Sequence, residues 1–249
     1  MSLEFLSPHP DGEPAPGAPE AASPVEPWLS EAGARFEHRH GWRVAVDFGA
    51  PAEELEACRR GVGIGDRSAL GKFELQGRPR ILESVLEGVL AEGPPGAGET
   101  ARLDDALLWA SSPDRALAIC EPAATPRIRE LLEGAAASPR CGLVEVTAGF
   151  AAFELRGPRS GELLERLTAI DVRPDALPPG GVRAGAVAEV PAVLLRPEPG
   201  AFLVVVSAPE APDAWEIALD VGAPLGLRPV GEAARVGAQP RVEGAPAHA

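Results

Sequence analysis

The residues of this sequence that are best suited to chemistry are carboxylates at predicted strand ends. They are Asp66, the adjacent pair Asp104 and Asp105, and Glu198. A carboxylate in a pocket can hydrogen-bond an amine or a ring nitrogen of a ligand, or act as a general base. Adjacent side chains on a strand point to opposite faces, so we expect only one of Asp104 and Asp105 to face a pocket. The alternative, that these carboxylates are solvated strand ends, stays open on sequence pattern alone.

Other reactive patterns are weak. The glycine run 61–66 lacks the G-x-G-x-x-G register and follows a predicted helix, which argues against a dinucleotide site. The histidines are His9, His38, His40 and His248, and the first and last of these lie in the chain tails, so no Ser/His/Asp triad is indicated.

The cysteines and histidines do not predict a metal site. Cys58, Cys120 and Cys141 are an odd number without C-x-x-C spacing, and we expect them to be small buried apolar residues in a reducing compartment. His38 and His40 have no acidic or cysteine partner at ligand spacing.

Composition excludes several classes of partner. The chain has 249 residues and a net charge of −14, which argues against nucleic-acid binding because phosphate backbones need a clustered basic surface. We find no apolar run of about 18 residues that could span a membrane. The first residues, Met1–Phe5, lack the basic and apolar regions of a signal peptide. A cytoplasmic protein is the expectation.

A repeated unit is the clearest sign of how these residues are positioned. Residues 73–80 read FELQGRPR and residues 153–159 read FELRGPR, and an apolar helical stripe follows each. Alternation, a Gly-Pro turn and then leucines at helical spacing predict a strand–turn–helix unit. Two copies indicate a pseudo-symmetric α+β domain. We expect their charged residues to be scaffold and not to take part in chemistry: Glu74, Arg80, Glu154 and Arg159.

The remaining pattern divides the chain into a domain between two tails. Residues 1–26 are rich in Pro, Glu and Ala and predict disorder, residues 27–243 a folded domain, and residues 244–249 a second disordered tail. Interleaved helices and antiparallel hairpins describe an α+β fold. The expected hairpins pair 103–109 with 116–120 and 187–195 with 201–207, and the expected helices start at Pro51 and cover 126–134 and 212–222.

Four segments, in order, resemble the glycine-cleavage aminomethyltransferase (T-protein) superfamily. Residues 45–75 resemble its G-L-F-D-V-S-H-M-G region, and residues 103–109 its I-D-D-L-x-V-Y strand. Residues 151–172 match L-A-L-Q-G-P-x-A-x-x-L-L, and residues 226–240 resemble the end of the folate-binding module.

The resemblance implies a pseudo-symmetric folate-binding module with mixed or antiparallel sheets flanked by helices, without the C-terminal β-barrel. It also implies tetrahydrofolate as cofactor, in a central channel. Carried over, the catalytic aspartate falls on Asp104 or Asp105. The cofactor contacts fall on Glu198, Asp66, Leu70 and Arg235.

Departures from the family pattern shape the expected function. Residues 68–71 read SALG in place of S-H-M-G, the G-Y-T-G signature is missing, and the match ends near Pro240, before the family's barrel. We therefore expect a tetrahydrofolate-binding, aminomethyltransferase-like protein of one-carbon and glycine metabolism, with or without independent catalysis. The alternative is a non-catalytic subunit similar to the γ subunit of heterotetrameric sarcosine oxidase. Reduced folate is the expected ligand, and a protein partner or self-association would fit the alternative.

Overall fold

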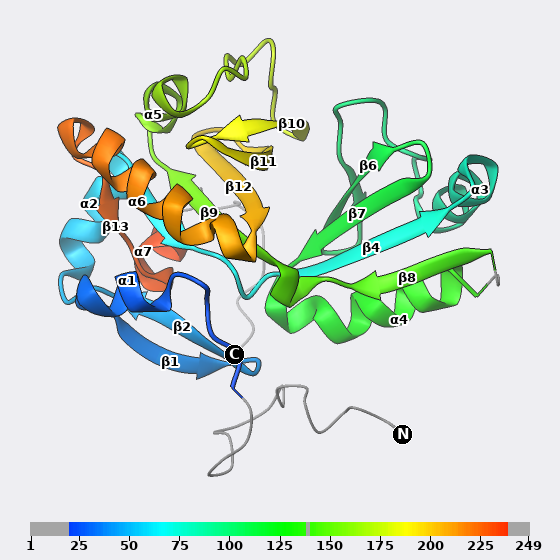
Figure 1. Ribbon diagram of the computed structural model, residues 1–249, viewed down its shortest axis with the longest axis horizontal. Coiled ribbons are helices and arrows are strands. Elements are labelled where there is room, and N and C mark those ends of the chain that lie inside the picture. Colours follow the sequence, from blue (N-terminus) through cyan, green and yellow to red (C-terminus); the bar gives the residue numbers. More distant parts are fainter. Residues whose placement is uncertain (1–19, 138–139, 239–249) are drawn as a thin grey trace, which may run out of the picture.

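Two antiparallel or mixed β-sheets that diverge from one another organise the molecule (Figure 1). The computed structural model describes residues 20–137 and 140–238. One sheet has six strands in the order β10-β11-β12-β9-β3-β13, and the other has five in the order β5-β6-β7-β4-β8. This confirms the predicted α+β class. Residues 1–19 of the expected tail over residues 1–26, and the whole expected tail over residues 244–249, lie outside the described residues.

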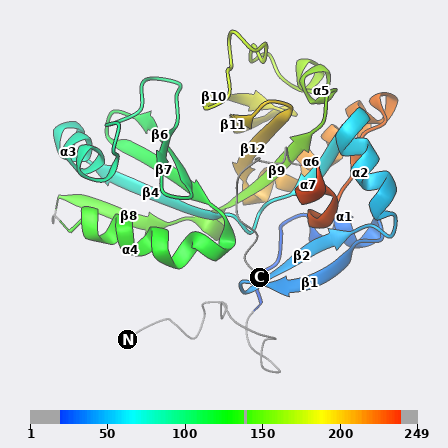
Figure 2. The same cartoon turned by 180° about the vertical axis from the view of Figure 1, so that it is seen from behind.

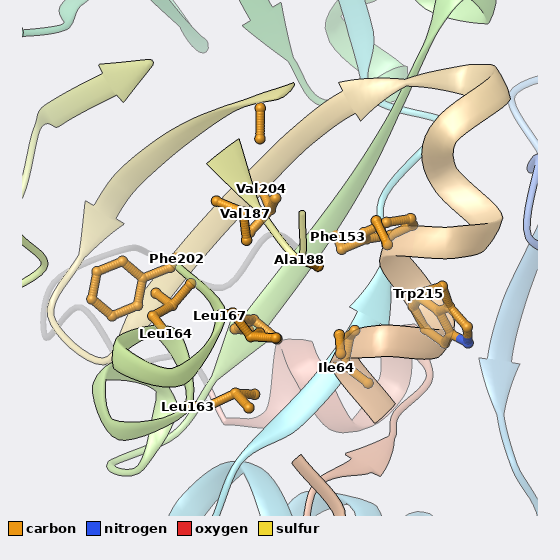
Figure 3. Packing of buried hydrophobic residues seen from close by; sticks show 14 of the residues in the cluster. Ile64, Phe153, Leu163, Leu164, Leu167, Val187, Ala188, Phe202, Val204 and Trp215 are labelled. Carbon is orange, nitrogen blue, oxygen red and sulfur yellow. The ribbon is translucent and has the colours of Figure 1, made fainter. Parts of the chain in front are cut away.

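The six-stranded sheet carries the larger core. Its strands are β3 (Gly63–Asp66), β9 (Phe150–Arg156), β10 (Gly181–Val187), β11 (Val190–Glu198), β12 (Ala201–Ser207) and β13 (Arg228–Pro229). All neighbours are antiparallel except β13 and β3. Helices α5 (Ser160–Leu167) and α6 (Ala211–Gly222) contribute buried leucines, alanines and Trp215 to this core. Phe153 and Trp215 make an edge-to-face contact with ring centroids 5.1 Å apart (Figure 3).

The five-stranded sheet has a separate core. Its strands are β4 (Gly71–Gly77), β5 (Ala101–Leu103), β6 (Ala106–Ser112), β7 (Arg115–Cys120) and β8 (Cys141–Glu145). Helices α3 (Pro79–Val89) and α4 (Thr125–Ala135) pack against Phe73 and Leu75 of β4 through Leu82, Leu86, Ile128 and Leu132. The repeated unit therefore forms β4–α3 in one sheet and β9–α5 in the other, as the sequence predicts.

The N-terminal and C-terminal segments meet beside the six-stranded sheet. They contain α1 (Glu26–Glu31), the two-stranded ribbon β1 (Arg35–Arg39) and β2 (Trp42–Asp47), α2 (Pro51–Arg60) and α7 (Glu232–Gly237). Figure 2 shows α2 and α7 on the same side of the molecule as this ribbon, and α7 contacts both α2 and β2. Short 3-10 helices complete the chain: η2 (Pro122–Ala124), η3 (Thr147–Gly149), η4 (Ala208–Glu210) and η5 (Ala223–Leu225).

A buried glutamate ties these segments together. Glu54 on α2 accepts hydrogen bonds from the backbone N–H groups of Phe48 at 2.7 Å and Gly231 at 2.9 Å. Gly231 precedes α7, and a Cβ there would lie 2.2 Å from the Val46 carbonyl carbon, so only glycine fits this approach. The start of α7 is thereby fixed against β2.

The inner faces of the two sheets meet through a third apolar cluster. It combines Trp109 and Ile119 of the five-stranded sheet with Leu195, Leu203 and Val205 of the six-stranded sheet. Leu70, just before β4, belongs to the same cluster. The two halves therefore share a buried seam and are not independent lobes.

Two turns differ from the sequence expectations. Asp104 and Asp105 form the turn between β5 and β6 and not part of a strand, and Asp104 has a positive φ of 54°. Ala188 and Glu189, with φ values of 50° and 64°, form a tight turn that splits the expected strand 187–195. Aspartate is one of the residue types enriched at positive φ, whereas the turn at Ala188 and Glu189 takes this conformation without a favourable residue type.

Ordered packing also begins before the expected boundary at residue 27. Ala21 bridges to Trp42, and Val25 is fully buried in the larger core. A single apolar residue in a Pro-rich segment carries little sequence signal, although its burial against a preformed core is favourable.

Candidate functional site

A cavity of about 490 Å³ opens where the two sheets diverge. Its walls come from both sheets and from α7: Arg67, Leu70, Arg102, Asp105, Leu107, Ile119, Cys120, Glu121, Ala123, Ala124, Arg127, Glu154, Arg156, Pro197, Glu198, Leu203 and Arg235. Its volume falls within the range of roughly 300–1,000 Å³ typical of small-molecule sites. An apolar floor with convergent charged groups gives it the character of a ligand site.

Buried charges form the wall on the six-stranded sheet. Glu154 lies among three guanidinium groups: Arg156 Nε is 2.5 Å from Glu154 Oε1, and Arg67 Nε and Arg235 Nη1 lie 3.6 Å and 3.4 Å from Oε2. All four side chains are buried. Glu154 is thus shared by three cations, each of which also contacts a second carboxylate.

More exposed acids surround this cluster. Arg67 Nη2 lies 2.5 Å from Glu121 Oε1, and Arg156 Nη2 lies 2.6 Å from Glu198 Oε1. Burial disfavours the charged form of Arg156, but Glu154 and Glu198 outweigh burial and raise its pKa. Burial, reinforced by the neighbouring Arg67, lowers the pKa of Arg235 from its usual range. The two arginines therefore differ in how fully their charge is compensated.

Strand periodicity explains why Glu154 and Arg156 reach the cavity. On β9, Phe153 and Leu155 point into the core of the six-stranded sheet, so the alternate residues Glu154 and Arg156 share the opposite face. Arg67 follows β3, the neighbour of β9 in the sheet. Arg235 comes from α7, whose start is fixed by Glu54.

The opposite wall is more polar and more open. The turn residues Asp104 and Asp105 both form ion pairs with Arg127 of α4, and the Asp105 contact measures 2.5 Å. Only Asp105 of the two lines the cavity. Arg102 of β5 adds an exposed cation at the rim.

The expected site residues fall into two groups. The structure brings together Asp105, Leu70, Glu198 and Arg235 in the cavity walls. Asp104 and Asp66 are not among the lining residues. Asp104 points toward Arg127 at the turn, and Asp66 accepts hydrogen bonds from the backbone N–H and the hydroxyl of Ser68.

Asp66 belongs to a second polar cluster, near the start of β4. Lys72, the only lysine of the sequence, donates from Nζ to the carbonyl oxygens of Ser68 at 2.8 Å and Leu70 at 2.9 Å. Burial lowers the pKa of Lys72 to about 7, with Asp66 opposing this effect. Burial also raises the pKa of Asp66. The cluster holds the loop that carries Leu70 into the cavity.

Sequence reasoning missed the centre of the charged wall. We expected the charges of the repeated unit to be scaffold, but Glu154 lines the cavity together with Arg156 and Arg67. The signal was present in the FELR pattern: two charges at alternate positions of a strand whose other face is apolar must project from the same side.

The cysteines match their prediction. Cys58, Cys120 and Cys141 are free thiols and are buried. Cys120 lies in the cavity wall, where burial raises the pKa of its thiol to about 11, so the thiol stays protonated at neutral pH. Within residues 20–137 and 140–238, none of the helices is long and apolar enough to cross a bilayer.

Comparison with known proteins defines the class to which this architecture belongs. The aminomethyltransferase T of the glycine cleavage system from Bartonella henselae has a similar structure, with a TM-score of 0.68, 18% identity, and coverage of 86% of this chain and 60% of that one. A chain of the heterotetrameric sarcosine oxidase from Corynebacterium sp. U-96, solved with pyrrole 2-carboxylate, gives a TM-score of 0.59 and 18% identity, covering 71% of this chain and 92% of that one. These likenesses establish a shared fold.

Sequence comparison gives the family. The GCVT N-terminal domain model matches residues 25–244, so the chain belongs to this family. Aminomethyltransferases from Geobacillus thermodenitrificans and Desulfitobacterium hafniense strain Y51 are 29% and 25% identical over 228 and 218 residues, covering 86% and 82% of this chain. The chain spans 61% and 59% of the length of these two curated relatives.

Proposed function

We propose that the cavity binds a reduced folate and that the chain is a tetrahydrofolate-binding, aminomethyltransferase-like protein of one-carbon and glycine metabolism. The observation that carries this proposal is the convergence of Asp105, Glu198 and Arg235 on one cavity between the two sheets. These three residues come from β-turn, strand and helix segments far apart in sequence. Membership of the GCVT N-terminal domain family supports the same ligand class.

The residues of the cavity are suited to hold such a ligand. The apolar side chains of Leu70, Leu107 and Ile119 offer a surface for an aromatic ring system. Carboxylates such as Glu198 and Asp105 accept hydrogen bonds from ring N–H and amino groups, which lack other partners once they leave water. The ligand would thus be oriented by acids at two walls and by apolar contact at the floor.

The geometry favours binding over independent catalysis. The Asp105 side chain is 65% exposed and already paired with Arg127. A general base works best when a pocket excludes water and aligns the base with the proton it takes. Asp105 in its present position is better suited to hold a ligand amine than to drive group transfer, and Asp104 adds to the same pair through Arg127.

Titration calorimetry with 5-formyltetrahydrofolate, together with thermal melting, tests this proposal. A ligand that binds only the native state raises its stability by about 2.7 kcal/mol at a hundred times Kd. We expect the wild type to show this increase, Asp105→Ala to bind more weakly, and Asp104→Ala to bind with closer to wild-type affinity. No change in melting temperature at millimolar folate would contradict the proposal.

A subunit role is the second candidate. The described fold matches 92% of one chain of a heterotetrameric enzyme, compared with 60% of the glycine-cleavage protein. Large exposed hydrophobic side chains among the described residues are Leu131, Val144 and Val236. Sedimentation velocity and co-purification test this role: a stable complex or self-association supports it, and a strictly monomeric species without a co-purifying partner contradicts it.

A further inference from the structure

A short segment joins the two sheets and contributes to the cavity wall. Residues 67–70, here called the connecting segment, run from the end of β3 in the six-stranded sheet to the start of β4 in the five-stranded sheet. Its first and last residues, Arg67 and Leu70, both line the cavity. Leu70 also belongs to the apolar cluster between the sheets, together with Trp109. The shape of the cavity therefore depends on how this segment is held.

The Lys72 side chain folds back onto the connecting segment. It is 3% exposed, and its Nζ donates to the carbonyl oxygens of Ser68 at 2.8 Å and Leu70 at 2.9 Å. The backbone of Lys72 is itself fixed, because its N–H donates to Thr147 Oγ1 at 3.0 Å and its carbonyl oxygen accepts from the Val146 N–H at 2.8 Å. A side chain anchored at its base thus binds two carbonyl groups of the segment that precedes it.

The two ends of the connecting segment are held differently. At the first end, the Arg67 N–H donates to the carbonyl oxygen of Ala152 on β9 at 2.7 Å. At the second end, the backbone of Leu70 makes its hydrogen bonds, among the described residues, with the Arg67 carbonyl oxygen and with Lys72. Lys72 is therefore the group that ties the Leu70 end to β4.

The composition sets this position apart. The chain has 23 lysine and arginine residues, and Lys72 is the only lysine among them. An amine is a compact donor on a flexible stem, whereas a guanidinium is a planar fork suited to carboxylates and phosphates. Two carbonyl oxygens that meet at one buried nitrogen match the amine. The basic residue at this position is thus the one whose shape the contacts require.

Titratable groups surround Lys72 Nζ on several sides. They are Asp66 at the end of β3, Arg67 of the connecting segment, Cys120 of β7 and Glu145 of β8. Burial is the largest influence and lowers the pKa of Lys72 to about 7, although Asp66 opposes it. A neutral amine still has two N–H donors for the two carbonyl oxygens. The contact with the segment is therefore available in both protonation states.

We propose that Lys72 is a positioning residue of the cavity: its amine holds the connecting segment in the conformation that places Arg67 and Leu70 in the cavity wall. Ligand affinity then depends on an amine that does not touch the ligand. The proposal rests on the proposed function for its ligand and adds the residue that shapes the binding surface.

The cavity thiol provides a local readout that needs no ligand. Cys120 lines the cavity beside the connecting segment, and a Cβ at Gly71 would lie 2.9 Å from its Sγ. Cys58 on α2 is the internal reference, because burial raises the pKa of both thiols to about 11. Alkylation of a buried thiol proceeds through opening of the structure around it. The rate ratio of Cys120 to Cys58 with iodoacetamide, measured by mass spectrometry, therefore reports local loosening apart from global unfolding.

Three variants test the amine. Lys72→Met keeps the stem without a donor, Lys72→Arg keeps the charge in a different shape, and Gln76→Met is the matched control at an exposed position of β4. We expect the two Lys72 variants to raise the alkylation ratio and to weaken 5-formyltetrahydrofolate binding in calorimetry, each by roughly 10- to 100-fold, as for the loss of buried hydrogen bonds. Gln76→Met should match the wild type in both measurements.

Chemical rescue separates the amine from mere space filling. Lys72→Ala removes the side-chain atoms beyond Cβ, which propylamine reproduces. We expect millimolar propylamine to return the alkylation ratio and the folate affinity of Lys72→Ala toward wild-type values, and propan-1-ol to have no such effect. Equal rescue by the two compounds, or rescue by neither, would overturn the proposal.

The wild type itself gives a test that does not depend on the folding of a variant. Protein labelled with ¹³C-lysine has one lysine side chain and hence one ε-methylene site to follow by NMR. We expect this signal to be shifted from that of free lysine and to titrate near pH 7. A signal at the free-lysine position that titrates near 10.5 would overturn the proposal, because the amine would then be in solvent.

The remaining outcomes separate the two proposals. If the wild type binds no 5-formyltetrahydrofolate but Cys120 alone becomes reactive in the Lys72 variants, the folate proposal fails and the positioning role of Lys72 stands. If the wild type binds the folate and the Lys72 variants keep its affinity and the wild-type alkylation ratio, the positioning role is overturned and the proposed function stands. A parallel rise in the alkylation of Cys120 and Cys58 would also overturn it, since Lys72 would then act on global stability.

Discussion

The two copies of the repeated unit place the same glutamate in different surroundings. In the first copy, Glu74 on β4 is partly exposed and lies 3.4 Å from Arg115 Nε, itself 45% exposed. In the second copy, Glu154 on β9 is buried among three guanidinium groups in the cavity wall. The sequence FEL is shared, and the fold decides whether its glutamate is a surface charge or the centre of a site.

The apolar and polar positions of the repeat lie in different surroundings. Phe73 and Leu75, like Phe153 and Leu155, point into a core covered by helices, and their size is fixed by packing. The alternate positions face the space between the sheets. There Lys72 is matched by Ala152, and Gln76 by Arg156. Pseudo-symmetry of the scaffold thus leaves the site free to be asymmetric.

Substituting the shared glutamate gives the largest expected difference between the copies. Glu154→Gln keeps the side-chain volume but leaves three buried guanidinium groups without their central carboxylate, so we expect a loss of about 3–5 kcal/mol in the free energy of unfolding. Glu74→Gln, the matched control, removes a partly exposed ion pair and should cost about 1 kcal/mol or less. Urea unfolding measures both values. Equal losses would contradict the contrast drawn between the two copies.

The glycine that ends each strand provides the next comparison. Gly157 has a φ of 134°, and a Cβ there would lie 2.4 Å from the Gly61 carbonyl oxygen. At Gly77 the nearest atom to such a Cβ, the Arg140 carbonyl oxygen, is 3.2 Å away, and the backbone conformation is an ordinary one for L-residues. We expect Gly157→Ala to cost about 3 kcal/mol and Gly77→Ala about 1 kcal/mol. Thermal unfolding of both variants checks this order, and a larger loss for Gly77→Ala would refute it.

The scaffold was predictable from sequence because it repeats a pattern with strong periodicity. Phe-x-Leu alternation followed by leucines at helical spacing depends on local rules, and both copies fold as those rules predict. The resemblance gave Glu198, Asp66, Leu70 and Arg235 as cofactor contacts. All of these except Asp66 line the cavity, and their role in binding stays a prediction.

The charged wall was harder to predict because its members come from separate elements. Arg67, Glu154 and Arg235 are brought together only by the pairing of β3 with β9 and by the docking of α7. The Asp104–Asp105 turn was missed for a different reason. Two-residue hairpin turns usually contain Gly or Asn, which makes them recognisable in a sequence. Aspartate at a positive φ is a weaker indication of such a turn.

The first copy of the repeat contains Lys72, whereas Ala152 occupies the matching position in the second copy. Only the first copy therefore contributes a lysine to the pH dependence of stability. The pKa of Lys72 is lowered to about 7 in the folded protein, from 10.5. Between these values the unfolded chain binds a proton that the native state does not, so the free energy of unfolding rises with pH. We expect Lys72 to contribute a rise of about 2 kcal/mol between pH 7 and pH 9.

Comparing the wild type with Lys72→Met isolates this contribution. Burial raises the pKa of Cys58 and Cys120 to about 11, which lowers stability as the pH passes 9, but both proteins share that effect. Urea unfolding at pH 7, 8 and 9 should therefore show a difference between the two proteins that grows as the pH rises. Parallel curves over this range would mean that Lys72 keeps its proton when folded.

The shared phenylalanine should show the smallest difference. Phe153 meets the edge of Trp215 on α6 at an interplanar angle of 65°, whereas Phe73 packs among aliphatic side chains of α3 and α4. An edge-to-face aromatic pair contributes roughly 0.5–1.5 kcal/mol beyond the area it buries. Phe153→Leu should therefore cost about 1 kcal/mol more than Phe73→Leu, since both lose similar apolar area. Urea unfolding of the two variants, repeated in a Trp215→Leu background, shows where the extra loss at Phe153 comes from. If the contact between the two rings is responsible, the extra loss disappears in that background. If the extra loss persists, local packing around β9 is the cause.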